Sequence, residues 1–128
     1  MTVVLKLQHV SVPMPPGSHD IARGFYGDVL GMTEKQPPTA LHDLNVVWFS
    51  AGDDVQEVHV FPDEGMNHNA SGQHLCLQVD SLESFRAQMS SHGVSIEETT
   101  PIRNRPRCFV RDPFGNLIEI AEILGDFD

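Results

Sequence analysis

The chain has 128 residues, a formal net charge of −10, and a hydrophobic fraction of 40%. This length and composition are typical of one compact globular domain, and the negative charge argues against nucleic acid or an anionic membrane surface as a partner. No apolar run approaches the ~20 residues of a membrane helix, the first residues lack the pattern of a secretory signal, and two cysteines are too few for a disulfide scaffold. We therefore expect a cytoplasmic protein.

The first half of the chain predicts one helix among four strands. Ser18 or Asp20 can cap a helix that runs to about Leu30, and Gly31 ends it. Its apolar face comprises Ala22, Phe25, Tyr26, Val29 and Leu30. Alternating side chains predict a strand over residues 5–12. Further strands are expected over 33–36, which ends at two prolines, and over 45–50 and 57–61, with a tight turn over 51–54.

The second half predicts the same order of elements after a polar linker over residues 63–72. A strand over 73–79 leads to a helix that opens on an apparent capping box at 80–83 and ends at Gly93. A short strand around Ile96 and a loop over 99–106 follow. Residues 107–111 and 117–123 then form a hairpin around the turn at 112–116.

This order is β-α-β-β-β twice, which predicts an α+β fold built by internal duplication. We expect one domain over residues 1–128, with module one at about 1–62 and module two at about 73–124. Two tandem βαβββ modules predict curved mixed sheets around a shared cleft, with the helices outside.

The repeat also places potential metal ligands at matching points. Residues 8–12 reappear as 73–77, which aligns His9 with His74; residues 58–60 match 118–120, which aligns His59 with Glu119. Imidazole and carboxylate suit zinc, nickel, iron or manganese, so these four residues are the candidate ligands of a divalent metal. Glu57 competes with His59, because residues two apart on a strand share a face.

Basic residues gather near the predicted hairpin. Four of the eight Lys and Arg residues fall within nine positions: Arg103, Arg105, Arg107 and Arg111. In an acidic protein this is a local positive patch, and Arg105 and Arg107 are candidates for holding an anionic group of a small-molecule substrate. Equally, these side chains can line an exposed strand face.

Three segments resemble signatures of the vicinal oxygen chelate superfamily, which includes glyoxalase I, extradiol dioxygenases and bleomycin-resistance proteins. They are residues 25–32 (FYGDVLGM), 74–80 and 112–120. The resemblance implies paired βαβββ modules, a metal that chelates adjacent oxygens of the substrate, and a homodimer. It places the family's two histidines and glutamate on His9, His74 and Glu119. Glyoxalase I has a further glutamate where this chain has His59.

The expected function is a metal-dependent lyase or isomerase of the glyoxalase type, acting on a small oxygen-rich substrate. The resemblance suggests that Glu119 serves both as ligand and as proton shuttle. An iron-dependent extradiol-type dioxygenase is an alternative, because His9, His74 and Glu119 match a two-histidine, one-carboxylate triad. A metal-free protein that binds a drug or metabolite is a second alternative.

Overall fold

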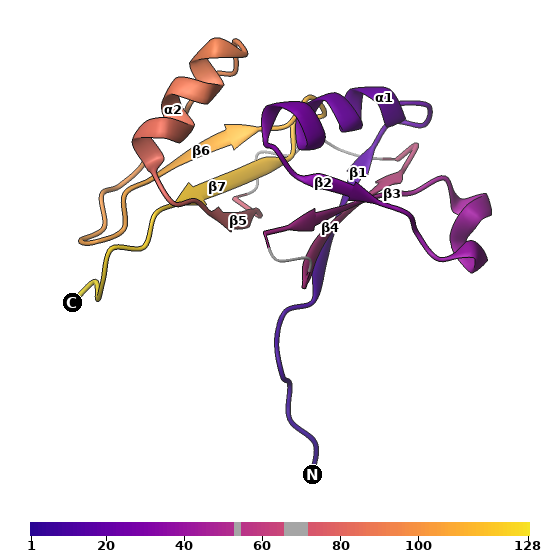
Figure 1. Ribbon diagram of the computed structural model, residues 1–128, viewed down its shortest axis with the longest axis horizontal. Helices are drawn as coiled ribbons and strands as arrows, with labels where there is room; N and C mark the ends of the chain where they lie inside the picture. The colour runs from indigo at the N-terminus through magenta and orange to yellow at the C-terminus, as the bar shows by residue number, and fades with distance from the viewer. Residues whose placement is uncertain (53–54, 66–71) are drawn as a thin grey trace. The chain divides into compact units, whose positions relative to one another are not determined.

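The computed structural model describes residues 1–52, 55–65 and 72–128 (Figure 1). The chain divides into two compact units, Met1–Asn67 (unit 1) and His68–Asp128 (unit 2). Each unit has its own mixed sheet and few helices, which confirms the predicted α+β class. The expected turn at 51–54 and linker at 63–72 lie partly outside the described residues. Within the described part, no helix is long and apolar enough to span a membrane.

Unit 1 has the predicted β-α-β-β-β order. Its strands and first helix are β1 (His9–Met14), α1 (His19–Ala22), β2 (Thr33–Lys35), β3 (Val47–Ala51) and β4 (Gln56–Pro62). The sheet order is β1-β4-β3-β2, with β1 parallel to β4 and the other pairs antiparallel.

The helical region of unit 1 is less regular than expected. The α-helix covers only α1, and the chain continues as a π-helix, η1 (Arg23–Val29), in which the Leu30 N–H reaches the Phe25 carbonyl at 2.9 Å. Gly31, at a φ of +74°, ends the segment as predicted. A 3-10 helix, η2 (Thr39–Leu44), was not predicted.

The expected start of the first strand at residue 5 is wrong. β1 begins at His9, which pairs with Glu57 near the start of β4, and the Gln8 carbonyl still accepts from the Glu57 N–H at 3.1 Å. Val4 and Leu5 are about 90% exposed (94% and 89%). Figure 1 shows this segment as an extended chain that leaves the sheet.

The two faces of the unit 1 sheet differ in chemistry. One face is apolar and packs against η1: the Tyr26 ring lies 5.5 Å from that of Phe49, and Val58 and Val60 are buried beside them. Alternation places polar and aromatic residues on the other face. The register aligns them in two cross-strand rows, Lys35-Trp48-His59-Ser11 and Thr33-Ser50-Glu57-His9.

Unit 2 repeats the plan with one strand fewer. It comprises β5 (Leu75–Gln78), α2 (Leu82–Ser91), β6 (Arg107–Arg111) and β7 (Leu117–Ala121), in the sheet order β5-β7-β6. The strand expected around Ile96 is reduced to an isolated bridge between Glu97 and Phe109. The prolines at 101 and 106 limit further pairing of the segment that follows.

Local hydrogen bonds fix the ends of α2 and the β6–β7 turn. Ser81 caps α2, because its Oγ accepts from the Ser84 N–H at 3.1 Å. A capping box needs Glu or Gln at position 84, so the expected box is not formed. Glu122 of the segment after β7 accepts from the Leu82 N–H at 2.9 Å. In the turn, Asp112 Oδ1 accepts from the backbone N–H groups of Phe114 and Asn116, each at 2.9 Å.

The strand register supports the internal duplication. Ser11 pairs with His59 in unit 1, and Cys76 pairs with Glu119 in unit 2. On the other side of the central strand, Trp48 opposes His59 as Phe109 opposes Glu119. His59 and Glu119 are therefore structural equivalents, as the sequence alignment of the two halves predicts.

Candidate functional site

Unit 1 brings two of the predicted ligands together in a stack of rings. The ring centroids of His9 and His59 are 4.1 Å apart with an interplanar angle of 18°, and those of Trp48 and His59 are 3.8 Å apart with an angle of 1°. His59 comes from the central strand β4, whereas His9 and Trp48 come from its two neighbours. The His59 ring is therefore held between the other two and is only 7% exposed.

Glu57 connects this stack to a cation. Its Oε1 lies 2.9 Å from Nε2 of His59, and its Oε2 lies 2.6 Å from Nζ of Lys35. The hydrogen bond from Lys35, reinforced by that from His59, lowers the pKa of Glu57 to about 2. Burial lowers the pKa of His59, which favours a neutral imidazole whose Nε2 proton is donated to Glu57. Its other nitrogen, Nδ1, then carries the lone pair.

His9 is also held in one orientation. Its Nδ1 lies 2.6 Å from Oε1 of Gln8, and the Gln8 side chain also hydrogen-bonds Glu57. Because a carboxylate only accepts, the Gln8 amide nitrogen faces Glu57 and its oxygen faces His9. His9 therefore donates from Nδ1, and in the neutral ring the lone pair is on Nε2.

Unit 2 brings the other two predicted ligands into direct contact. Nε2 of His74 lies 3.0 Å from Oε1 of Glu119, and Nδ1 of His74 lies 2.6 Å from the Gly72 carbonyl oxygen. That carbonyl can only accept, so Nδ1 carries a proton. The opposite nitrogen of a neutral ring would then point a lone pair at a carboxylate. A cation or a further proton is needed to make this contact favourable.

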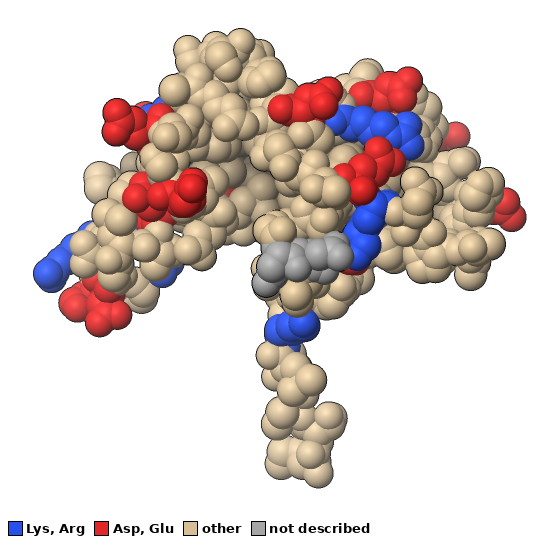
Figure 2. Space-filling view, in the orientation of Figure 1, with Lys and Arg blue, Asp and Glu red and all other residues tan. Residues whose placement is uncertain are grey.

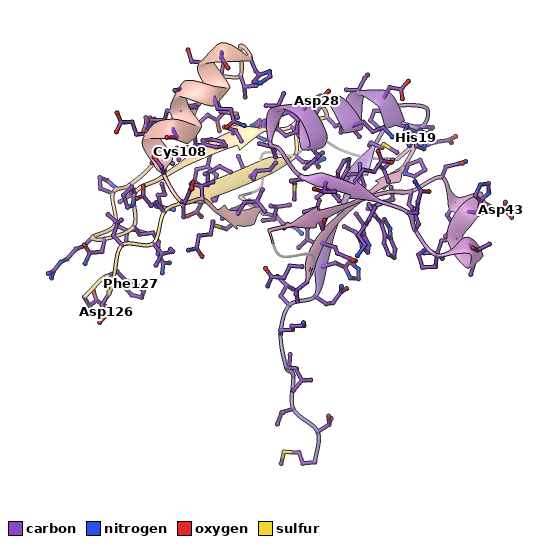
Figure 3. All side chains as sticks on the ribbon, in the orientation of Figure 1. His19, Asp28, Asp43, Cys108, Asp126 and Phe127 are labelled. Atoms are coloured by element: carbon purple, nitrogen blue, oxygen red, sulfur yellow. The ribbon has the colours of Figure 1, made fainter. Side chains whose placement is uncertain are left out.

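The predicted substrate-binding arginines differ in their surroundings. Arg107 donates to Oε2 of Glu119 at 3.3 Å and to the Thr100 carbonyl at 3.1 Å, and its side chain is 16% exposed. The Arg105 guanidinium lies 4.9 Å from the ring centre of Phe127, a residue of the C-terminal segment labelled in Figure 3. Arg107 therefore contacts a candidate ligand, whereas Arg105 contacts the terminal segment.

The donor chemistry fits a divalent metal, although no single cluster is complete. Among residues 1–52, 55–65 and 72–128, no three His, Cys, Asp or Glu side chains gather as a metal-holding group. Instead, each unit offers a pair: His9 with His59, and His74 with Glu119. The Gly72 contact to His74 is of the kind that orients metal-binding histidines through their second nitrogen.

Two members of the unit 1 arrangement were missed in the sequence. Neither Trp48 nor Lys35 is among the site residues that the sequence predicts. The two residues contact the site across strands: Lys35, Trp48 and His59 form one row only in the register that β2, β3 and β4 adopt.

Acidic side chains are spread over the visible surface, in line with the net charge (Figure 2).

A family model described as the Glyoxalase/Bleomycin resistance protein/Dioxygenase superfamily matches residues 6–120. The chain belongs to this superfamily. None of the curated proteins matches the sequence.

Solved structures resemble the chain over nearly its whole length. A glyoxalase family protein from Bacillus anthracis is 30% identical, with a TM-score of 0.88, and the match covers 96% of this chain and 98% of that one. Lactoylglutathione lyase from Agrobacterium tumefaciens is 21% identical (TM-score 0.67; 91% and 92% covered). An antibiotic-binding protein from a Streptomyces species is 16% identical (TM-score 0.72; 96% and 99% covered). The glyoxalase superfamily fold thus occurs in proteins named as enzymes and as binders.

Proposed function

We propose that this glyoxalase superfamily protein is a metal-dependent lyase or isomerase that acts on a small oxygen-rich substrate. The observation that supports it most is the contact between His74 and Glu119. His74 donates its Nδ1 proton to the Gly72 carbonyl, so in the neutral ring the lone pair is on Nε2. This nitrogen lies 3.0 Å from Oε1 of Glu119. A divalent cation would bind both atoms as ligands.

The remaining ligands would come from the pair in unit 1. His9 would bind through Nε2, because its Nδ1 proton is donated to the Gln8 side-chain oxygen. His59 would bind the metal through Nδ1, because its Nε2 proton is donated to Glu57. Glu57, two residues before His59 on the same strand, is the alternative to His59 as a ligand. One chain or two chains of a homodimer would supply the two pairs.

A bound divalent ion would act as a Lewis acid that polarises a substrate carbonyl and stabilises the negative charge that develops on it. Arg107 holds Oε2 of Glu119 and leaves Oε1 directed toward His74. Glu119 would accept a substrate proton through its carboxylate. The contacts of Arg107 use two of the five guanidinium N–H groups, so the same side chain can also bind an anionic group of the substrate. Arg105 would extend this positive patch.

A binding protein without a metal is the second candidate function. The stack of Trp48, His59 and His9 supports it, because flat aromatic surfaces bind planar ligands. The structural likeness to an antibiotic-binding protein is consistent with this use of the fold. An iron-dependent dioxygenase is the third candidate, distinguished from the first by the metal it retains and by consumption of oxygen.

Elemental analysis of protein purified without chelator tests the proposal. We expect about one divalent metal ion per site, lost in His9→Ala, His74→Ala and Glu119→Ala. His42→Ala is the matched control, because the His42 side chain is 89% exposed and lies outside both donor pairs. Absence of bound metal after reconstitution with zinc, nickel, iron and manganese would contradict the enzyme proposal and favour the binding protein.

A further inference from the structure

We infer that Lys35 and Glu57 are positioning residues that fix the ring orientation and tautomer of His59 and, through it, the stack with His9 and Trp48. The inference deepens the proposed function, because His9 and His59 are two of its candidate ligands. The positioning of the His59 ring does not depend on the proposed function, whereas the expected effect of Glu57 on metal binding does.

The geometry gives each oxygen of Glu57 one strong donor. Lys35 Nζ lies 2.6 Å from Oε2, and His59 Nε2 lies 2.9 Å from Oε1. Only 9% of the side-chain surface of Glu57 and of His59 is exposed. A carboxylate this buried requires compensation, which Lys35 provides as a charge and His59 as a donor. Glu57 therefore accepts from Lys35 with one oxygen and from the His59 Nε2–H with the other.

The same carboxylate reaches the second histidine. Gln8 hydrogen-bonds Glu57 with its amide and accepts from His9 Nδ1 at 2.6 Å with its oxygen. Glu57 therefore selects the His59 tautomer with its lone pair on Nδ1, and Gln8, beside Glu57, holds the Nδ1 proton of His9. The parallel rings of the stack hold those nitrogens in place.

Unit 2 shows why unit 1 needs this arrangement. In unit 2 the residue equivalent to His59 is Glu119, and the residue equivalent to Glu57 is Leu117. The residue equivalent to Lys35 is Glu97, because it opposes Phe109 as Lys35 opposes Trp48. A carboxylate has equivalent oxygens and no tautomer to fix. An imidazole at the same position presents a donor or a lone pair according to which nitrogen is protonated, so it depends on a partner that selects one form.

Long-range ¹⁵N–¹H NMR of the histidine rings in the metal-free full chain tests the inference. In the wild type we expect His59 to be the Nε2–H tautomer. Glu57→Leu, which introduces the residue found at the equivalent position of unit 2, should give mixed tautomers. Glu57→Gln keeps an acceptor oxygen and should be intermediate, which covers the case that Glu57→Leu fails to fold.

The matched control is Glu34→Gln, which breaks the ion pair between Glu34 of β2 and Arg23 of η1 without touching His59. It should leave the His59 tautomer unchanged. The fluorescence of Trp48, the single tryptophan, should change in Glu57→Leu and not in Glu34→Gln. A wild-type His59 protonated on Nδ1, or an unchanged tautomer in both Glu57 variants, would overturn the inference.

Zinc titration separates this inference from the proposed function. We expect Glu57→Leu to weaken zinc binding roughly 10-fold to 100-fold, as loss of an orienting partner does in other metal sites. Unchanged zinc affinity with an altered His59 tautomer would overturn the link to metal binding. Failure of the wild type to bind zinc would count against the proposed function, and the tautomer result alone would then decide the positioning role.

Discussion

Nε2 of His74 lies 3.0 Å from Oε1 of Glu119, although the two residues are 45 positions apart in the sequence. The contact follows from the parallel pairing of β5 with β7, in which Cys76 opposes Glu119 and His74 precedes β5. Since the Nδ1 proton of His74 is donated to Gly72, the contact needs either a cation between the two groups or a second proton on the ring. The metal proposal depends on this pair more than on any other.

Replacing Glu119 by Gln should therefore weaken zinc binding by at least about tenfold, because the amide is neutral and its oxygen is a poorer ligand than a carboxylate. Equilibrium dialysis against a zinc buffer measures the change. Glu98→Gln is the control, since Glu98 pairs with Arg86 on the surface of unit 2 and is 66% exposed. Equal zinc affinity in both variants would remove Glu119 from the ligand set.

The Lys35–Glu57 pair should contribute to stability in a pH-dependent way. The folded pKa of Glu57, about 2, is lower than its ordinary value of 4.5. A lowered carboxylate pKa stabilises the fold above the unfolded pKa, and the contribution disappears as pH falls from about 4.5 toward 2. Urea unfolding between pH 7 and pH 2 should show this decline in the wild type.

At pH 7, Glu57→Gln should lower the free energy of unfolding by about 1–3 kcal/mol, because buried charged hydrogen bonds are lost. Glu34→Gln should cost no more than about 1 kcal/mol, since the Arg23–Glu34 pair is more exposed. A steeper acid-induced decline in Glu57→Gln than in the wild type would contradict the assignment.

The core of unit 2 should be sensitive to cavities. Ile118 is fully buried in β7, so Ile118→Ala should destabilise the protein by about 2–5 kcal/mol and Ile118→Val by about 0.5–1.5 kcal/mol. Ile123 is 42% exposed, and Ile123→Ala serves as the control with an effect within about 1 kcal/mol. Chemical denaturation measures all three, and comparable losses for Ile118→Ala and Ile123→Ala would mean that the buried face of β7 is misassigned.

The two cysteines should react differently with thiol reagents. Cys108, labelled in Figure 3, is fully buried, whereas Cys76 is exposed. Burial, and then the negative charge of Glu119, raises the pKa of the Cys76 thiol, so labelling should be slow at pH 7 and faster as pH rises. One thiol should react in the native protein and two in denaturant. Native labelling that persists in Cys76→Ser would show that Cys108 is accessible.

Local sequence patterns predicted much of the fold because they report local physics. Sequence patterns located β3 and β4, the turn at 112–116 located the hairpin of β6 and β7, and Gly31 marked the helix end through its positive φ. The start of β1 and the reduced strand around Ile96 were not predictable in this way. Both depend on whether a neighbouring strand is present to pair with, which is a non-local property.

The candidate site was predictable to the extent that the duplication reveals it. Aligning His59 with Glu119 required only the repeated apolar flanks, and the strand register supports that alignment. The neighbours that control His59 were not predicted, because Lys35 and Trp48 reach it across strands. The roles of His9, His59, His74 and Glu119 as metal ligands stay predictions.

Calorimetric titration of metal-free protein with zinc is the most direct test of the central claim, with His74→Ala as the comparison. The account predicts saturable binding near one ion per site in the wild type and loss of that binding in His74→Ala, with the fold of the variant retained. Zinc binding of equal affinity and stoichiometry in both proteins, or none in the wild type, would contradict it.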